Sequence, residues 1–141
     1  MSEVQLRVPC HLVEPLLEAV AIRDGAERVV FALVSSATTG TKTLLLMRDL
    51  VAAPSDAYLD PQGHGARWSG RFTLEILNRA LRDNLGVVIL HEHLTLGSRP
   101  VALSRDDRGS AEELLMRFGA VQPHRPHGSV VLGETSAAGV F

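Results

Sequence analysis

The sequence predicts an α/β fold in which one domain holds a central mixed β-sheet flanked by helices. Apolar runs of strand length occur at 27–36, 41–52 and 87–90, and segments of helical period lie before, between and after them. Turn residues separate the two kinds of segment. Strands and helices that alternate along 141 residues are typical of a single α/β domain, so residues 1–141 are assigned to one domain.

Composition excludes several classes of function. The chain has 14 basic and 16 acidic side chains, so it has no excess of positive charge for nucleic acid. Cys10 is the single cysteine and cannot form an internal disulfide. The first residues lack the apolar core of a signal peptide, and no apolar run approaches the roughly 20 residues of a membrane span. A soluble, cytoplasmic protein is expected.

The first third of the chain predicts a helix followed by a β-hairpin. Apolar residues recur at near-helical spacing over Cys10–Ile22, and we expect the helix to start near Pro15, because proline cannot sit deep inside a helix. Two buried strands, Glu27–Ser36 and Thr41–Ala52, are joined by the turn Thr39-Gly40.

A long loop and a helix follow. Residues Ala53–Gly70 are rich in Pro, Gly, Ser and Asp, and a loop of this length is unusual unless it covers or feeds a site. Tyr58 and Trp68 are expected to pack it, with substrate binding as the alternative role. Thr73–Leu85 has leucines at amphipathic spacing and predicts a helix that stops at Gly86.

The last part of the chain begins with a buried strand at Val87–Leu90. Ser104 is expected to be an N-cap with acidic residues in the first turn, leading into a helix at Ala111–Phe118 that ends at Gly119. The rest is assigned to a loop at Gln122–Gly128, a strand at Ser129–Leu132 and a tail of ambiguous structure.

Two histidines directly follow the apolar strand. His91 and His93 stand at i and i+2, so on an extended chain both imidazoles point to the same face and can reach one metal ion. An aspartate after Ser104 would supply a third, oxygen ligand and leave one tetrahedral position open, as catalytic zinc requires. Asp106 and Asp107 both stand at this helix start and are the two candidates for the oxygen ligand.

The other histidines and the cysteine are not expected to belong to a functional site. His64, His124 and His127 lie in predicted loops and are expected to be solvated rather than bound to metal. Cys10 is expected to be a buried apolar side chain, because no base is fixed near it to activate a thiol.

The segments His91-Glu92-His93 and Ser104-Arg105-Asp106-Asp107 resemble the His-x-His and Ser-x-x-Asp signature of the JAB/MPN (JAMM) metalloproteases, in their bacterial branch. The likeness extends over nearly the whole chain in element order and implies an MPN-like α/β fold. It implies that His91, His93 and Asp107 bind Zn²⁺. It also implies that Glu27, before the first long strand, handles the proton of the catalytic water, with Glu14 and Glu18 as competitors.

The chain departs from this family pattern in the segment after the histidines. Ten residues, Leu94 to Leu103, separate His93 from Ser104, so the loop is longer than is usual in the family. Leu94 replaces a proline that often follows the second histidine, and Glu92 places a carboxylate between the two. These differences concern the loop more than the ligand set.

The expected function is zinc-dependent hydrolysis of a peptide or isopeptide bond. Zn²⁺ would polarise the scissile carbonyl and lower the pKa of water toward about 7, Glu27 would carry the proton to the leaving amine, and Ser104 would donate a hydrogen bond to the oxyanion. The resemblance implies a ubiquitin-like or sulfur-carrier substrate and an E1-like activating enzyme as partner. The alternatives are a catalytically silent MPN interaction module and a zinc hydrolase of a small molecule.

Overall fold

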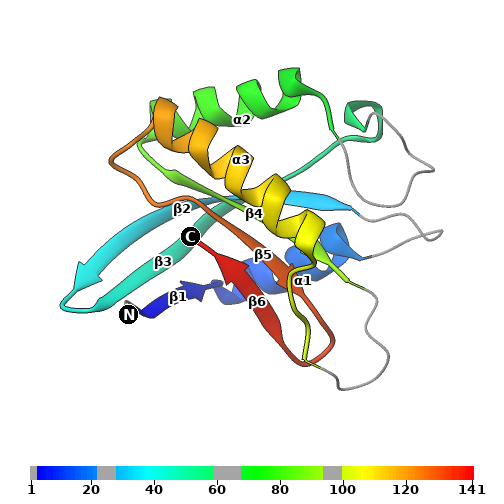
Figure 1. The fold of residues 1–141 in the computed structure, drawn as a ribbon, viewed down its shortest axis with the longest axis horizontal. Helices are drawn as coiled ribbons and strands as arrows, with labels where there is room; N and C mark the ends of the chain where they lie inside the picture. The colour runs from blue at the N-terminus through cyan, green and yellow to red at the C-terminus, as the bar shows by residue number, and fades with distance from the viewer. Residues whose placement is uncertain (1–2, 22–27, 59–67, 94–99) are drawn as a thin grey trace.

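A mixed β-sheet runs through the centre of the molecule, and helices cover both of its faces (Figure 1). The computed structural model describes residues 3–21, 28–58, 68–93 and 100–141. Within them, six strands follow the order β1-β3-β2-β4-β5-β6 across the sheet. The strands are β1 (Glu3–Arg7), β2 (Val29–Thr39), β3 (Lys42–Ala52), β4 (Gly86–Glu92), β5 (Gly128–Leu132) and β6 (Ala137–Val140), and the helices are α1 (Cys10–Val20), α2 (Gly70–Asp83) and α3 (Arg105–Val121).

The predicted α/β class is confirmed. β2 is antiparallel to both β3 and β4, whereas β1 pairs with β3 and β5 pairs with β4 in parallel. The parallel pair β4 and β5 is connected through α3, the usual way to join parallel strands. Among the described residues, no helix is long and apolar enough to cross a membrane.

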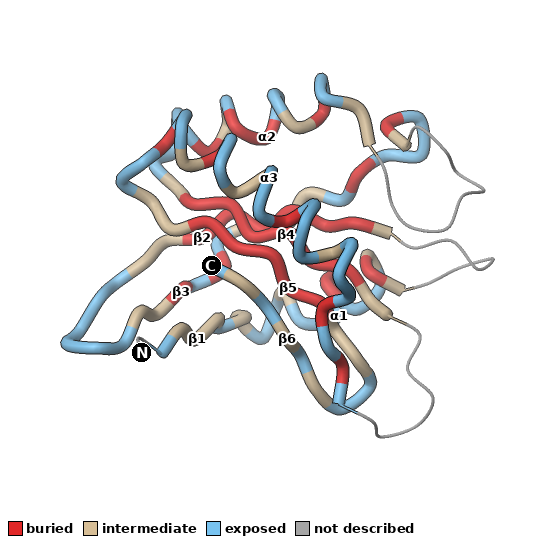
Figure 2. Tube along the Cα trace, viewed as in Figure 1, coloured by how far each residue is buried: buried red, intermediate tan, exposed pale blue. Residues whose placement is uncertain are grey.

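Both faces of the central strands are buried, which explains their continuous apolar sequences. Alternate side chains of β2 and β4 pack under α2 and α3 on one face and under α1 on the other (Figure 1). Figure 2 shows the buried segments concentrated along β2, β4 and β5. Phe31 and Phe118 are fully buried on the face of α2 and α3, and Leu45 and Met47 are fully buried on the face of α1.

The predicted hairpin is confirmed. β2 and β3 pair from Thr39↔Lys42 to Val30↔Ala52, with an irregularity at Leu33/Val34. Gly40 in the turn has φ of 60°, a value at which glycine is not strained. The predicted first residue of this strand, Glu27, lies outside the described residues.

The predicted start of the first helix is wrong, as is the predicted burial of Cys10. α1 begins at Cys10, which is exposed, and contains Pro15 within it. Proline at this position removes one intrahelical hydrogen bond. The buried side chains Leu16 and Val20, which pack against the sheet, hold the helix in place despite that loss.

Gly86 does not end the second helix. α2 has Ser69 as N-cap, whose Oγ accepts a hydrogen bond from the Phe72 N–H at 3.3 Å, and ends at Asn84 in the left-handed conformation with φ of 56°. Gly86 is the first residue of β4, where an added Cβ would lie 2.0 Å from the carbonyl oxygen of Pro126. The glycine is therefore required by a close backbone approach.

Three elements differ from the prediction. β1 was not predicted, and the tail of ambiguous structure forms β6 at the other edge of the sheet. The last helix runs without interruption from Arg105 to Val121, and Gly119 lies inside it.

Tyr58 and Trp68, at the described ends of the predicted long loop, pair with each other and pack against the core. They form an isolated antiparallel bridge, and the Trp68 ring meets Phe31 edge to face at 5.4 Å between centroids. The Trp68 Nε1–H donates to Thr73 Oγ1 at 2.7 Å, and the Tyr58 hydroxyl accepts a hydrogen bond from the Val29 N–H at 2.9 Å. Residues 59–67 of this loop, which include His64, lie outside the described residues.

Candidate metal centre

The two histidines stand at the end of a strand that is paired on both sides. His91 pairs with Val29 of β2 and with Val131 of β5, and the ladder continues to His93, whose N–H donates to the Leu132 carbonyl at 3.0 Å. Because side chains alternate along a strand, both imidazoles lie on the face of the sheet that α2 and α3 cover. Their ring centroids are 4.9 Å apart.

A capping box at the start of α3 orients the third candidate ligand. Ser104 Oγ accepts a hydrogen bond from the Asp107 N–H at 3.1 Å. In return, Asp107 Oδ2 accepts from the Ser104 N–H at 2.9 Å and from the Ser104 hydroxyl at 2.6 Å. This reciprocal arrangement satisfies unpaired groups at the helix start and fixes the direction of the carboxylate. The predicted N-cap is therefore confirmed.

The three side chains converge on one point. His91 Nε2 lies 3.1 Å from His93 Nε2 and 3.6 Å from Asp107 Oδ1, and His93 Nε2 lies 3.3 Å from Asp107 Oδ2. Four ligands at about 2.0–2.1 Å around a tetrahedral ion are about 3.3–3.4 Å apart. The separations are near this spacing, with the two distances to Asp107 ending on different carboxylate oxygens, and one ligand atom from each residue lies within 4.8 Å of the others, so His91, His93 and Asp107 could hold one metal ion.

The triad is neither deeply buried nor fully open. Its side chains are 11%, 22% and 21% exposed for His91, His93 and Asp107. Burial raises the pKa of the Asp107 carboxyl group, but the hydrogen bonds from Ser104 and the charges of His91 and His93 outweigh it, so that pKa lies below the ordinary value of Asp. The carboxylate is consequently ionised at neutral pH and can act as a ligand.

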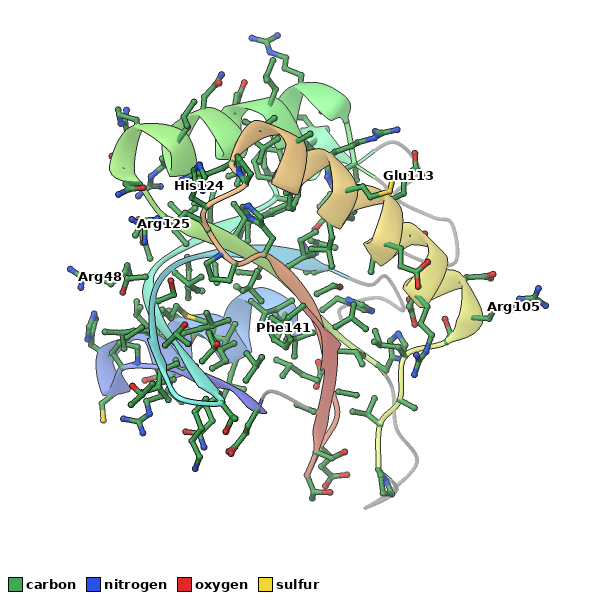
Figure 3. All side chains as sticks on the ribbon, turned by 60° about the vertical axis from the view of Figure 1, so that its left-hand side comes forward. Arg48, Arg105, Glu113, His124, Arg125 and Phe141 are labelled. Carbon is green, nitrogen blue, oxygen red and sulfur yellow. The ribbon has the colours of Figure 1, made fainter. Side chains whose placement is uncertain are left out.

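Asp107, and not Asp106, belongs to the triad. Asp106 is exposed in the first turn of α3 and is not part of the cluster. Its neighbour Arg105 projects from the start of the same helix away from the fold (Figure 3). A capping box explains the difference, because it turns the residue three positions after Ser104 back toward the N-cap.

Among the described residues, no carboxylate considered for proton transfer belongs to the triad cluster. Glu27 lies outside the described residues, and Glu14 and Glu18 are exposed on α1, on the opposite face of the sheet. Glu92 is half-buried at the end of β4, where strand alternation directs it away from the face of the histidines.

His127 is not solvated, contrary to the prediction, whereas His124 is exposed as predicted. The His127 Nδ1 accepts a hydrogen bond from the Val87 N–H at 3.2 Å, and its Nε2 donates to the Gln122 carbonyl at 3.0 Å. Burial lowers its pKa, although the hydrogen bond to Gln122 opposes that shift. The ring has a structural role, because it ties the loop before β5 to the start of β4.

Comparison with known proteins adds no assignment. No protein-family model matches the chain, and a search of curated proteins gives no significant match. The function is therefore inferred from the residues of the triad and their surroundings.

Proposed function

We propose that this protein is a zinc-dependent peptidase or isopeptidase that processes or deconjugates a ubiquitin-like protein or sulfur carrier. The observation that carries the proposal is the convergence of His91, His93 and Asp107 on one point. Two imidazoles and a carboxylate with a further position for water or substrate are the ligand set of catalytic zinc sites. The resemblance of the two motifs to JAMM metalloproteases supplies the reaction and the class of substrate.

The ligand types support zinc over magnesium or calcium. Two of the three side chains offer imidazole nitrogens, which zinc binds readily, whereas magnesium and calcium prefer oxygen ligands.

The metal ligands and Glu27 have separate tasks in the proposed mechanism. When bound, zinc supplies Lewis acidity, which polarises the scissile carbonyl and makes water a better nucleophile at neutral pH. His91, His93 and Asp107 hold and orient it. The Glu27 carboxylate takes the proton of the attacking water and returns it to the leaving amine. Val29, two residues after Glu27 in the chain, pairs with His91, which supports this assignment.

Ser104 has two tasks in the proposed reaction. Its hydroxyl donates to Asp107 Oδ2 at 2.6 Å in the structure and so orients the metal ligand. To donate to the oxyanion, the hydroxyl would rotate away from Asp107, while the Ser104 N–H continues to hold the carboxylate at 2.9 Å.

The triad argues against a catalytically silent interaction module, because such a module does not need a complete ligand set. A zinc hydrolase of a small molecule uses the same ligands, and a substrate assay distinguishes it. The first substrate to test is a ubiquitin-fold protein that carries a cleavable C-terminal extension.

The decisive variant is Glu27→Gln, which keeps the size of the side chain but cannot accept a proton at neutral pH. We expect cleavage to slow by about 10²-fold to 10⁴-fold, with zinc content by elemental analysis unchanged. Glu14→Gln is the matched control, since it removes one exposed carboxylate from α1, and it should cleave at the wild-type rate. Full activity of the zinc-loaded Glu27 variant would exclude that residue from the mechanism.

A further inference from the structure

A pocket of about 390 Å³ lies where β2 begins and β3 ends. Its walls come from α1, from the two strand ends and from the segment after β3. The residues that matter for its chemistry are Glu18, Ala19, Arg28, Val29, Ala53 and Tyr58. Its volume is within the range of sites that hold small ligands or a few residues of a peptide.

Arg28 is the unusual residue of this pocket. Its Nε is buried, and no group among the described residues accepts a hydrogen bond from it. No ion pair of Arg28 occurs within the described ranges, even with Glu18 in the same pocket wall. A buried donor without an acceptor is costly, and the cost is greater for a charged group. Arg28 also lines the pocket, so a ligand bound there would supply an acceptor to this guanidinium through its terminal nitrogens or after a small side-chain rotation that exposes Nε.

The pocket adjoins the metal centre. Val29 lines the pocket and is also the residue of β2 that pairs with His91. Directly paired residues of neighbouring antiparallel strands have Cα atoms about 4.5–5.5 Å apart. Tyr58 adds a second donor, because its hydroxyl accepts from the Val29 N–H and keeps its own proton for another partner.

The charges select the kind of ligand. Among the described residues that line the pocket, Arg28 is the one cation and Glu18 the one anion. A phosphate with two negative charges would meet a single cation and a repelling carboxylate. A carboxylate carries one charge and matches the planar fork of a guanidinium. From this balance we infer that the pocket is a carboxylate-binding site, in which Arg28 holds the carboxylate of a small acid or of a chain end.

The test measures binding, not hydrolysis, in the full chain. It uses a protein with His91→Ala and His93→Ala, so that a carboxylate cannot bind at the metal. The probe is N-acetylglycine, the neutral comparison is its amide, and the readout is the NMR signal of the Arg28 Nε–H. We expect the acid to shift this signal and the amide to leave it unchanged. An equal response to acid and amide would overturn the inference, as would stronger binding of inorganic phosphate than of the acid.

Two variants separate a ligand site from a structural arginine. Arg28→Lys keeps the charge but loses the fork, and binding of the acid, measured by calorimetry, should weaken by about tenfold or more. Glu18→Gln removes the repelling charge from the same pocket and should bind the acid at least as tightly as the parent protein. Unchanged binding in the Arg28 variant, or weaker binding in the Glu18 variant, contradicts the assignment.

Two peptides identify the source of the carboxylate. If acetyl-tetraalanine with a free C-terminus binds more tightly than N-acetylglycine, the pocket takes a chain end, and if both bind equally it takes a small acid. Each result supports the site. Because hydrolysis is measured separately on the zinc-loaded wild type, loss of carboxylate binding leaves the proposed function standing, and absence of hydrolysis leaves this pocket standing.

Discussion

Asp107 and Asp106 provide a matched pair for testing the metal centre. Both are acidic residues in the first turn of α3, but only Asp107 faces the histidines. Changing either one to Asn removes one negative charge from the helix start, which costs about 0.3–1 kcal/mol without metal. Asn at 107 also keeps an oxygen that can accept from Ser104. Asp107→Asn also loses the charge that Ser104 and the two histidines stabilise, so it should be the less stable variant when zinc is absent, and each variant is compared with itself with and without zinc.

The two variants should differ in how much zinc stabilises them. At a free zinc concentration of about 100 times the wild-type dissociation constant, binding stabilises the folded chain by about 2.7 kcal/mol. Loss of an outer-shell partner already weakens metal binding by up to about 100-fold, and loss of a ligand should cost at least that much. The same zinc would then stabilise the Asp107→Asn protein by only about 0.4 kcal/mol.

The assay is thermal unfolding with and without zinc at fixed protein concentration. The difference of about 2 kcal/mol corresponds to about 6–10 °C in Tm for a domain of this size. Asp106→Asn should keep the full zinc-dependent rise. Equal zinc-dependent rises in the two variants would show that the carboxylate of Asp107 is not a ligand and would refute the geometric argument.

Three further predictions follow from the fold. Replacing both His91 and His93 with Ala should abolish zinc binding, and near-stoichiometric zinc after dialysis would contradict the ligand assignment. Because burial lowers the pKa of His127, the unfolded chain binds the proton more readily, and the free energy of unfolding should fall as the pH drops below about 6.5. Urea titrations should show this slope in wild type and a smaller one in His127→Gln. Gly86→Ala should destabilise the fold by about 1–3 kcal/mol, because its Cβ would meet a backbone carbonyl at 2.0 Å. Gly109→Ala should stabilise the fold by about 0.5–1 kcal/mol, because Gly109 lies within α3 and no atom is within 4 Å of an added Cβ. If calorimetry finds Gly86→Ala as stable as Gly109→Ala, the close approach at Gly86 is contradicted.

The buried strands could be predicted because their signal is local. Continuous apolar sequence identified β2 and β4, and the turn at Gly40 defined the hairpin. β1 has only five residues and depends on parallel pairing with β3, a partner some 39 positions away at Glu3↔Lys42. Pro15 was misleading for a related reason, since tertiary packing of Leu16 outweighs an unfavourable local preference.

The ligands of the candidate site could also be predicted from local sequence spacing. The spacing of His91 and His93 on a strand determines that they share a face, and the spacing of Ser104 and Asp107 is that of a capping box. Arg28 gave no signal in the sequence, because its missing partner is a property of the folded surroundings. His127 was misassigned because its loop position does not reveal the backbone groups that it bonds.

The triad joins two parts of the fold that differ in how easily they open. His91 lies in a strand with neighbours on both sides, and such central strands are among the last parts of a protein to open. His93 directly follows this strand, and its N–H is bonded to the Leu132 carbonyl. Asp107 belongs to the first turn of a helix, and helix ends fray far more often. An ion held by all three would therefore depart from the helix side, with the histidines still in position. The strength of the Ser104 cap then governs how long an ion resides, while the strand governs where it is held.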